Sequence, residues 1–217
     1  MKFPEPVLIT DAFAVNSEFQ VEKIDDVVII DNLFKDWVKV RNCFIYSPPF
    51  NWKMPKGTRN FIDYYDCRHF FSHYEGFPFD EPLRKVIKHV YGNDTELVRN
   101  GIRTNWFKQI KPKTSEWAQL HFDHTKPNEE FTMITFLNTD EECSGGTSIF
   151  KGLKDIDGHT GMDYWSNLKY YGNPLNIEMK PGRTIIFPSE LVHAAWHPID
   201  SFYDFPRHNM VCRFVPL

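Results

Sequence analysis

Residues 119–138 read "QLHFDHTKPNEEFTMITFLN" and join two histidines and an aspartate to a run rich in β-branched and aromatic residues. Residues of this kind favour strands, so "FTMITFLN" predicts a buried β-strand. If the chain is also extended over residues 119–123, His121 and Asp123 project from one face and His124 from the other. An imidazole and a carboxylate side by side can hold a metal ion, but so short a triplet has little specificity alone. The rest of the chain has to supply a third ligand.

The C-terminal half, from about residue 96, consists largely of short segments with the composition of β-strands. Turn signals rich in proline, glycine and asparagine separate them. The expected strands lie in "ELVRNGIRTNWFKQI", "WAQLHFD", "FTMITFLN", "TSIF", "LNIEM", "RTIIFP" and "HNMVCRFV". Seven or eight short strands with few helices between them favour an antiparallel sandwich or barrel. We therefore expect a mostly β fold with flanking helices and a jelly-roll-like core over residues 96–217.

Residues 1–95 predict a helical or irregular support region packed on that core, within one structural domain. "VVIIDNLF" (27–34) has the apolar run of a short buried strand. Apolar residues then recur at three- and four-residue spacing as far as residue 44, which predicts a helix. Asp31 or Asn32 is the expected cap of this helix.

A second helix is expected over residues 80–92. Asp80 is its expected cap, an apolar stripe follows at helical spacing, and Gly92 is its expected stop. Residues 47–79 are rich in proline, glycine and aromatic residues and are expected to be irregular. Residues 151–175 contain four glycines and are expected to form an inserted loop over one end of the core.

Composition and charge narrow the classes of partner. The chain has 217 residues, of which 41% are hydrophobic and 25% charged, with a net charge of −4. This charge gives no general attraction to nucleic acid or to an anionic membrane, although a local basic groove stays open. We therefore expect no membrane partner, and we regard nucleic acid as an improbable one.

The cysteines and the N-terminal residues favour a cytoplasmic location. The four cysteines form no C-x-x-C pair and lie far apart, at Cys43, Cys67, Cys143 and Cys212. Buried reduced thiols fit this spacing better than a disulfide framework does. The start of the sequence has prolines and acidic residues where a signal peptide has a basic and then an apolar stretch. No run of about 18 apolar residues predicts a membrane span.

His193 is the best candidate for the third ligand. It follows a Pro-Gly turn, a strand and a Pro-Ser turn in "MKPGRTIIFPSELVHAAWHP" (179–198), a rigid position from which to approach the first pair. Two histidines and one carboxylate on one side of a metal form the facial triad of non-heme Fe(II) oxygenases. That arrangement leaves coordination positions open. His121, Asp123 and His193 are therefore the candidate catalytic and metal-binding residues.

The last expected strand carries candidate residues for an anionic ligand. In "RHNMVCRF" (207–214) strand alternation places Arg207, Asn209 and Arg213 on one face. An arginine that points into a barrel requires a negatively charged partner. Its planar guanidinium suits a carboxylate better than lysine does.

Taken together, the motifs resemble those of the Fe(II)/2-oxoglutarate-dependent dioxygenases, in particular the prolyl-hydroxylase-like members. The ordered set is the H-x-D pair, "SGGTSIF" (144–150), the Pro-Gly turn before the last histidine, and an arginine 14 residues after that histidine. The match covers roughly residues 103–216. The resemblance implies a double-stranded β-helix core and Fe(II) bound by His121, Asp123 and His193. It further implies that Arg207 binds the distal carboxylate of the cosubstrate 2-oxoglutarate, with O₂ as oxidant.

At two positions the sequence departs from the family pattern. Ile110 and Phe136 stand where such proteins often have a tyrosine near the cosubstrate. The resemblance therefore implies that the cosubstrate pocket is partly rebuilt or that it holds a different ligand. The spacing of Arg207, Asn209 and Arg213 also resembles the last strand of the alkylation-repair demethylases, where the asparagine and the second arginine also contact 2-oxoglutarate.

Three functions follow from these patterns. The first is a 2-oxoglutarate-dependent hydroxylase of a protein side chain or a small molecule, with succinate and CO₂ as coproducts. The second is a nucleic-acid demethylase, which would need an electropositive groove and base flipping. The third is a non-enzymatic metal-binding or structural β module, because the same fold can host unrelated functions. The sequence leaves the substrate and the oligomeric state open.

Overall fold

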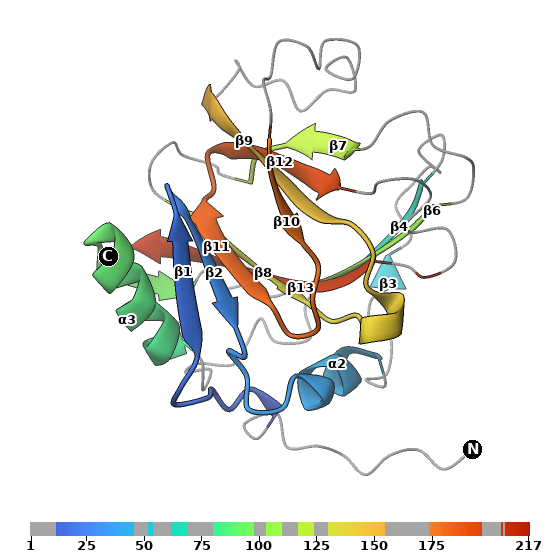
Figure 1. The fold of residues 1–217 in the computed structure, drawn as a ribbon, viewed down its shortest axis with the longest axis horizontal. Coiled ribbons are helices and arrows are strands. Elements are labelled where there is room, and N and C mark those ends of the chain that lie inside the picture. Colours follow the sequence, from blue (N-terminus) through green and yellow to red (C-terminus); the bar gives the residue numbers. More distant parts are fainter. Residues whose placement is uncertain are drawn as a thin grey trace.

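Two antiparallel β-sheets form the framework of the protein (Figure 1). The computed structural model describes residues 12–45, 52–53, 62–68, 80–97, 103–109, 117–123, 130–154, 174–196, 205 and 207–217. Among these residues, nine strands form the large sheet and four form the small sheet. The expected mostly β architecture is confirmed.

The large sheet contains strands from both ends of the chain. In spatial order its strands are β1 (Gln20–Ile24), β2 (Val27–Asp31), β11 (Thr184–Pro188), β8 (Phe131–Phe136), β13 (Arg207–Pro216), β6 (Arg103–Gln109), β4 (Ile62–Arg68) and β3 (Trp52–Lys53), with β5 (Thr95–Leu97) beside β13. The small sheet has the order β10 (Leu175–Glu178), β9 (Gly146–Lys154), β12 (Leu191–Trp196) and β7 (Trp117–His121). The strands predicted beyond residue 96 are therefore present.

The space between the two sheets is filled by an apolar cluster, here called the barrel core. Its members alternate along each strand with residues of the opposite face, as the two-residue period of a strand requires. Ile134 and Phe136 of β8 and Val211 of β13 face this core, where they meet Ile149 of β9 and Phe187 of β11. Burial of this cluster therefore fixes which polar residues of β8 and β13 also point inward.

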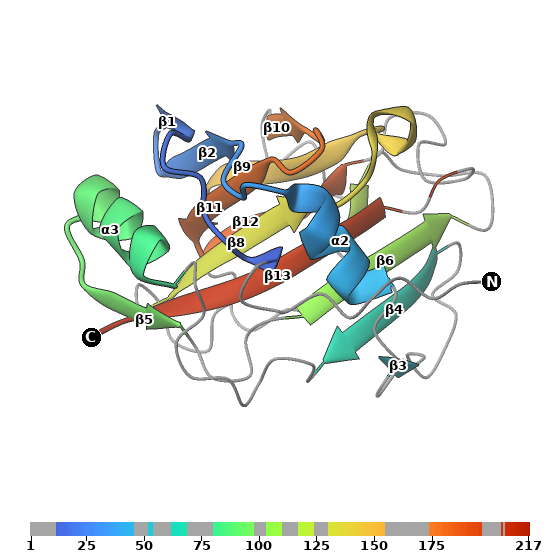
Figure 2. The ribbon, with the colours of Figure 1, turned by 90° about the horizontal axis from the view of Figure 1, so that it is seen from below.

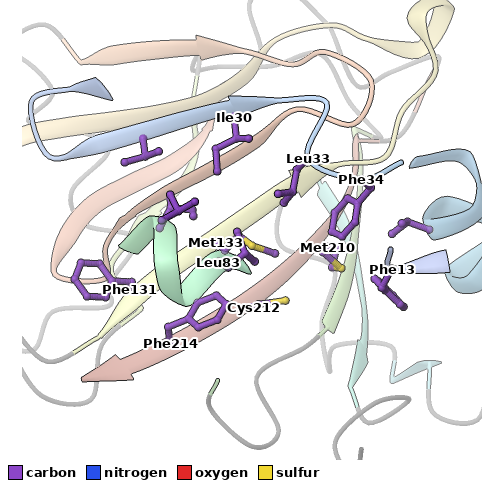
Figure 3. Packing of buried hydrophobic residues seen from close by; sticks show 14 of the residues in the cluster. Phe13, Ile30, Leu33, Phe34, Leu83, Phe131, Met133, Met210, Cys212 and Phe214 are labelled. Atoms are coloured by element: carbon purple, nitrogen blue, oxygen red, sulfur yellow. The ribbon is translucent and has the colours of Figure 1, made fainter. Parts of the chain in front are cut away.

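The opposite face of the large sheet packs on the helices. Met133 of β8 and Met210 of β13 lie in a second apolar cluster with Leu83 of α3 (Asp80–Tyr91) and Val40 of α2 (Trp37–Ile45). Figure 3 shows Leu83, Met133 and Met210 in this cluster. In Figure 2, α2 lies across the strands of the large sheet and α3 lies near its β1 end. The central strands β8, β11 and β13 are thus largely buried on both faces.

The extent of α3 agrees with the sequence prediction, but the expectation that Asp80 caps it is wrong, because Asp80 is its first residue and its carboxylate accepts two hydrogen bonds of 2.9 Å from Arg84. The helix spans Asp80–Tyr91, it buries Leu83, Val86 and Ile87 against the sheet, and Gly92 follows it with a φ of 78°. The positive φ explains the glycine, because a side chain there would be strained. Neither helix in the described part of the chain is long and apolar enough to cross a membrane.

The predicted start of α2 is wrong. The helix begins at Trp37, and Asp36 caps it by accepting a hydrogen bond from the Lys39 N–H at 3.2 Å. Asp31 is instead paired with Arg183 through two contacts of 2.7 and 2.9 Å, and Asn32 has a φ of 59°. The ion pair with Arg183 removes the carboxylate from the helix, and a left-handed residue cannot start one.

The prediction that residues 47–79 are irregular is wrong for residues 52–53 and 62–68. They include β3 and β4, and all seven residues of β4 pair with β6 in the large sheet. In a separate part of the chain, β1 and β2 form a hairpin whose turn contains Asp25 at a φ of 53°. The composition of residues 47–79 does not predict β4, because this strand forms by pairing with β6, a segment about 40 residues farther along the chain.

Gly182 offers a test of how the turn before β11 packs on α2. Its φ is 69°, and a Cβ at this position would lie 2.8 Å from Cγ and 2.9 Å from Cβ of Trp37. Gly182→Ala is expected to lower the free energy of unfolding by about 1–2 kcal/mol for the left-handed backbone and by a further ~1–3 kcal/mol for the steric clash. Urea denaturation measures this loss.

Gly92→Ala is the matched control for that variant. Gly92 has a φ of 78°, but nothing lies within 4 Å of its added Cβ. We expect this variant to show the backbone cost without the steric cost. Equal losses for the two variants would show that Trp37 does not restrict Gly182.

Candidate metal centre

The two candidate histidines face each other across the β7–β12 ladder. His121 and His193 are register partners, and their ring centroids lie 4.3 Å apart. The Nδ1 of His193 lies 3.0 Å from the carbonyl oxygen of Leu191, and Phe187 packs edge-on at 4.8 Å between centroids. A hydrogen bond at Nδ1 leaves Nε2 available for a metal. His193 is thus oriented by its own strand and by the barrel core.

Asp123 completes the group from just beyond the end of β7. The strand ends at His121, so the expectation of an extended strand to residue 123 is wrong by two residues. The main-chain N–H of Asp123 donates to the carbonyl oxygen of Ser189 at 3.0 Å. The hydroxyl of Thr132 donates to its carboxylate at 3.3 Å. The turn between β11 and β12 therefore holds this residue in place of a strand partner.

The three side chains form a cluster whose donor atoms suit Fe(II). The ligand atoms of His121, Asp123 and His193 all lie within 4.8 Å of one another. The carboxylate oxygens of Asp123 lie 3.8 Å from His121 Nε2 and 3.6 Å from His193 Nε2. These separations exceed a direct hydrogen bond. Two imidazoles and one carboxylate are the donor set of non-heme Fe(II) sites, so the residues fit this metal.

A buried arginine lies inside the same barrel. Arg207 is 3% exposed, and its guanidinium donates to the Thr147 hydroxyl at 2.9 Å and to the Asn209 side-chain oxygen at 3.3 Å. The ring of Phe136 lies 5.4 Å from the guanidinium carbon. These contacts orient the guanidinium inside the barrel. The arrangement is suited to a carboxylate ligand that enters the barrel.

Two solved structures similar to this chain depend on α-ketoglutarate or hold iron. SnoK, a non-heme, α-ketoglutarate-dependent carbocyclase of nogalamycin biosynthesis, has a TM-score of 0.60 at 13% identity, over 88% of this chain and 79% of its own. The iron-bound EctD of S. alaskensis has a TM-score of 0.53 at 13% identity, over 95% and 88%. The chain has the fold of the iron- and 2-oxoglutarate-dependent oxygenases. The expected double-stranded β-helix is therefore confirmed.

A third structure with this oxygenase fold holds a peptide. It is a prolyl hydroxylase from Trichoplax adhaerens in complex with a fragment of the hypoxia inducible factor oxygen degradation domain. Its TM-score is 0.51 at 12% identity, over 88% of this chain and 84% of its own. No protein-family model matches the sequence, and no curated protein sequence matches it. At these identities the likeness shows the fold.

The remaining predicted site residues lie in two places in the oxygenase fold. Asn209 contacts Arg207 inside the barrel, as its strand face implied. Arg213 lies farther along the same strand, where its Nη1 donates to the main-chain oxygen of Asp123 at 2.9 Å and to Glu130 at 3.0 Å. Ile110 and His124 lie outside the described residues, as do residues 155–173 of the expected loop. The roles assigned to Asn209 and Arg213 in cosubstrate binding stay predictions.

Several polar residues near the site were not among the sequence candidates. Thr132 and Ser189 share a hydroxyl–hydroxyl hydrogen bond of 2.7 Å next to Asp123, and Thr147 supports Arg207. All three are buried. Thr132 occupies the same strand face as Ile134 and Phe136, so strand alternation could have marked it as an inward polar residue.

His208 lies on the opposite face of β13 and is a buried structural histidine. It is 3% exposed, and burial lowers its pKa to about 3, with a further lowering by the nearby Arg41 and an opposing effect of Glu142. Arg41 itself is held by Glu142 and by the carbonyl oxygen of Leu137. His208 is therefore neutral in the folded protein at physiological pH.

The lowered pKa of His208 predicts a loss of stability in mild acid. The unfolded chain takes up a proton near pH 6.5, whereas the folded protein does so near pH 3. The contribution of His208 to the free energy of unfolding is therefore fully present above pH 6.5. Below that pH it falls by about 1.4 kcal/mol per pH unit, as far as the folded pKa of about 3. Between pH 7 and 5.5 the loss is about 1 kcal/mol. Urea denaturation at the two pH values should show that the free energy of unfolding of His208→Phe falls by about 1 kcal/mol less than that of the wild type. An equal fall in both proteins would place His208 in a more solvated site.

Proposed function

We propose that the protein is an Fe(II)- and 2-oxoglutarate-dependent dioxygenase that hydroxylates a protein side chain or a small molecule. The observation that carries the proposal is the joint placement of two sites in one barrel. The cluster of His121, Asp123 and His193 suits Fe(II), and the buried Arg207 suits a carboxylate. If the three polar side chains had only a structural role, the arginine oriented inside the same barrel would have no explanation.

Each residue has a distinct part in this proposal. His121, Asp123 and His193 would hold the iron, which when bound supplies the activation of O₂ and of the keto acid. Arg207 binds the distal carboxylate of 2-oxoglutarate, and Thr147 and Asn209 fix the plane of its guanidinium. Phe136 covers the guanidinium with an apolar ring in place of a tyrosine hydroxyl. The apolar barrel core excludes water, which strengthens the interaction between the two charges.

The substrate is expected to approach past His121. The side chain of His121 is 31% exposed, whereas that of His193 is 3% exposed. His121 lies on β7, which is the last strand of the small sheet among the described residues. Proteins of this fold include a carbocyclase of antibiotic biosynthesis and a prolyl hydroxylase with a bound peptide, which supports both a small molecule and a protein side chain as substrate.

Succinate formation tests the proposed function. Purified protein with Fe(II), 2-oxoglutarate and air is incubated with the small-molecule, protein or nucleic-acid fraction of a cell extract. We expect one of the first two fractions to stimulate succinate release above that of the His193→Ala variant. Stimulation by nucleic acid would favour the demethylase. Release equal to that of the variant with every fraction would contradict an oxygenase.

A further inference from the structure

The main chain of Asp123 is held by groups from two other parts of the fold, the turn between β11 and β12 and the strand β13. β7 ends two residues earlier, so no strand pairing fixes Asp123. Its N–H donates to the carbonyl oxygen of Ser189 at 3.0 Å, and its own carbonyl oxygen accepts from Arg213 Nη1 at 2.9 Å. These two contacts lie on opposite sides of one residue and therefore restrict its backbone orientation.

Glu130 closes these contacts into a ring. Its carboxylate accepts from the same Nη1 of Arg213 at 3.0 Å, and its carbonyl oxygen accepts from the Ser189 N–H at 2.9 Å. The Glu130 and Arg213 side chains are 9% and 29% exposed, so water screens this ion pair only in part. Asp123, Ser189, Glu130 and Arg213 are thus linked in one cycle beside the metal cluster.

The carboxylate of Asp123 is oriented by the same region. Thr132 donates to it at 3.3 Å and shares a 2.7 Å hydrogen bond with the Ser189 hydroxyl. Thr132 is also the register partner of Arg213 in the β8–β13 ladder. The backbone and the side chain of this ligand are therefore both determined from the β8–β13 edge of the barrel.

We propose that Arg213 is a positioning residue for the metal ligand Asp123, with Glu130 as its anchor, and that it does not bind the cosubstrate. The inference rests on the proposed metal site and goes beyond it, because it assigns Arg213 to the metal and Arg207 alone to the distal carboxylate. Partners that orient a metal ligand affect metal affinity by about 10- to 100-fold when they are removed.

The test is the affinity of the apo protein for Co(II) alone, followed by its visible absorption. Arg213→Met is expected to weaken Co(II) binding by about 10- to 100-fold. Arg183→Met is the matched control, because Arg183 forms a comparable ion pair with Asp31 away from the metal cluster. We expect the control to lose stability in urea and to keep the Co(II) affinity of the wild type.

A lysine at position 213 separates positioning from carboxylate binding. Both contacts of Arg213 use the single nitrogen Nη1, and a lysine ammonium can donate to two acceptors at once. Arg213→Lys is therefore expected to recover most of the Co(II) affinity. An arginine that holds a carboxylate with its planar fork would not be replaced in this way. Glu130→Gln, which keeps the acceptor but removes the charge, should weaken Co(II) binding less than Arg213→Met does.

The outcomes distinguish this inference from the proposed function. If the wild type binds Co(II) and Arg213→Met binds it equally well, the positioning role is wrong while the metal site stands. If Arg213→Met keeps Co(II) affinity but loses affinity for 2-oxoglutarate, Arg213 binds the cosubstrate. If the wild type itself binds no Co(II), the proposed function fails. If Arg213→Met does not fold, the Co(II) affinities of Arg213→Lys and Glu130→Gln are compared with that of the wild type in its place.

Discussion

Asp123→Ala is expected to abolish Fe(II) binding. The change removes the single carboxylate of the cluster, so one coordination bond and the only negative charge among the three ligands are lost. Loss of a supporting partner costs about 10- to 100-fold in metal affinity, so loss of the ligand itself should cost more than ~100-fold. Isothermal titration of the apo protein with Fe(II) under anaerobic conditions measures the effect.

The control for this loss is Asp31→Ala. Asp31 is also a carboxylate that is paired with an arginine, and the hydrogen bond from Arg183 lowers its pKa. Removal of Asp31 should reduce stability and leave Fe(II) binding unchanged. Wild-type Fe(II) affinity in Asp123→Ala would show that the three side chains are not the metal site.

Arg207→Met is expected to remove the preference of the protein for a keto acid with two carboxylates. Truncation of one partner of a buried charge pair costs about 2–5 kcal/mol, or roughly 30- to several-thousand-fold in affinity. We therefore expect the wild type to bind 2-oxoglutarate much more tightly than 2-oxobutyrate, which lacks the distal carboxylate. Arg207→Met should bind the two acids with similar affinity.

Metal binding is the internal control for that comparison. Arg207 contacts Thr147, Asn209 and Phe136, and none of these is a candidate metal ligand. Arg207→Met should therefore bind Fe(II) with the affinity of the wild type. The variant need not be less stable, because replacing a buried charge by an apolar side chain can be neutral. A wild type that binds both acids equally would show that Arg207 does not recognise the distal carboxylate.

Local pattern was sufficient for the features that one strand or helix determines. Strand alternation placed Arg207 and Asn209 inside the barrel, and both are buried there. Helical spacing and a glycine stop predicted α3 to within one residue. The order of motifs identified His193 as the partner of His121, and the β7–β12 register brings the two side by side.

Features that depend on distant partners could not be predicted in this way. Asp31 is a suitable helix cap by its type, but Arg183, 152 residues later, binds its carboxylate. β4 forms because β6 lies beside it. The contact between Arg213 and the Asp123 carbonyl joins residues 90 positions apart, and no spacing rule predicts it. These contacts arise from tertiary packing, which overrides local propensity.

The central claim is that Fe(II) and 2-oxoglutarate bind together inside the barrel. Anaerobic absorption titration of the apo protein with Fe(II) and then 2-oxoglutarate tests it most directly, because a visible charge-transfer band requires the metal and the keto acid at one site. We predict a weak band on addition of 2-oxoglutarate that is absent in His121→Ala and weaker in Arg207→Met. Fe(II) binding without any band at saturating 2-oxoglutarate would contradict the account and favour a metal-binding module without oxygenase activity.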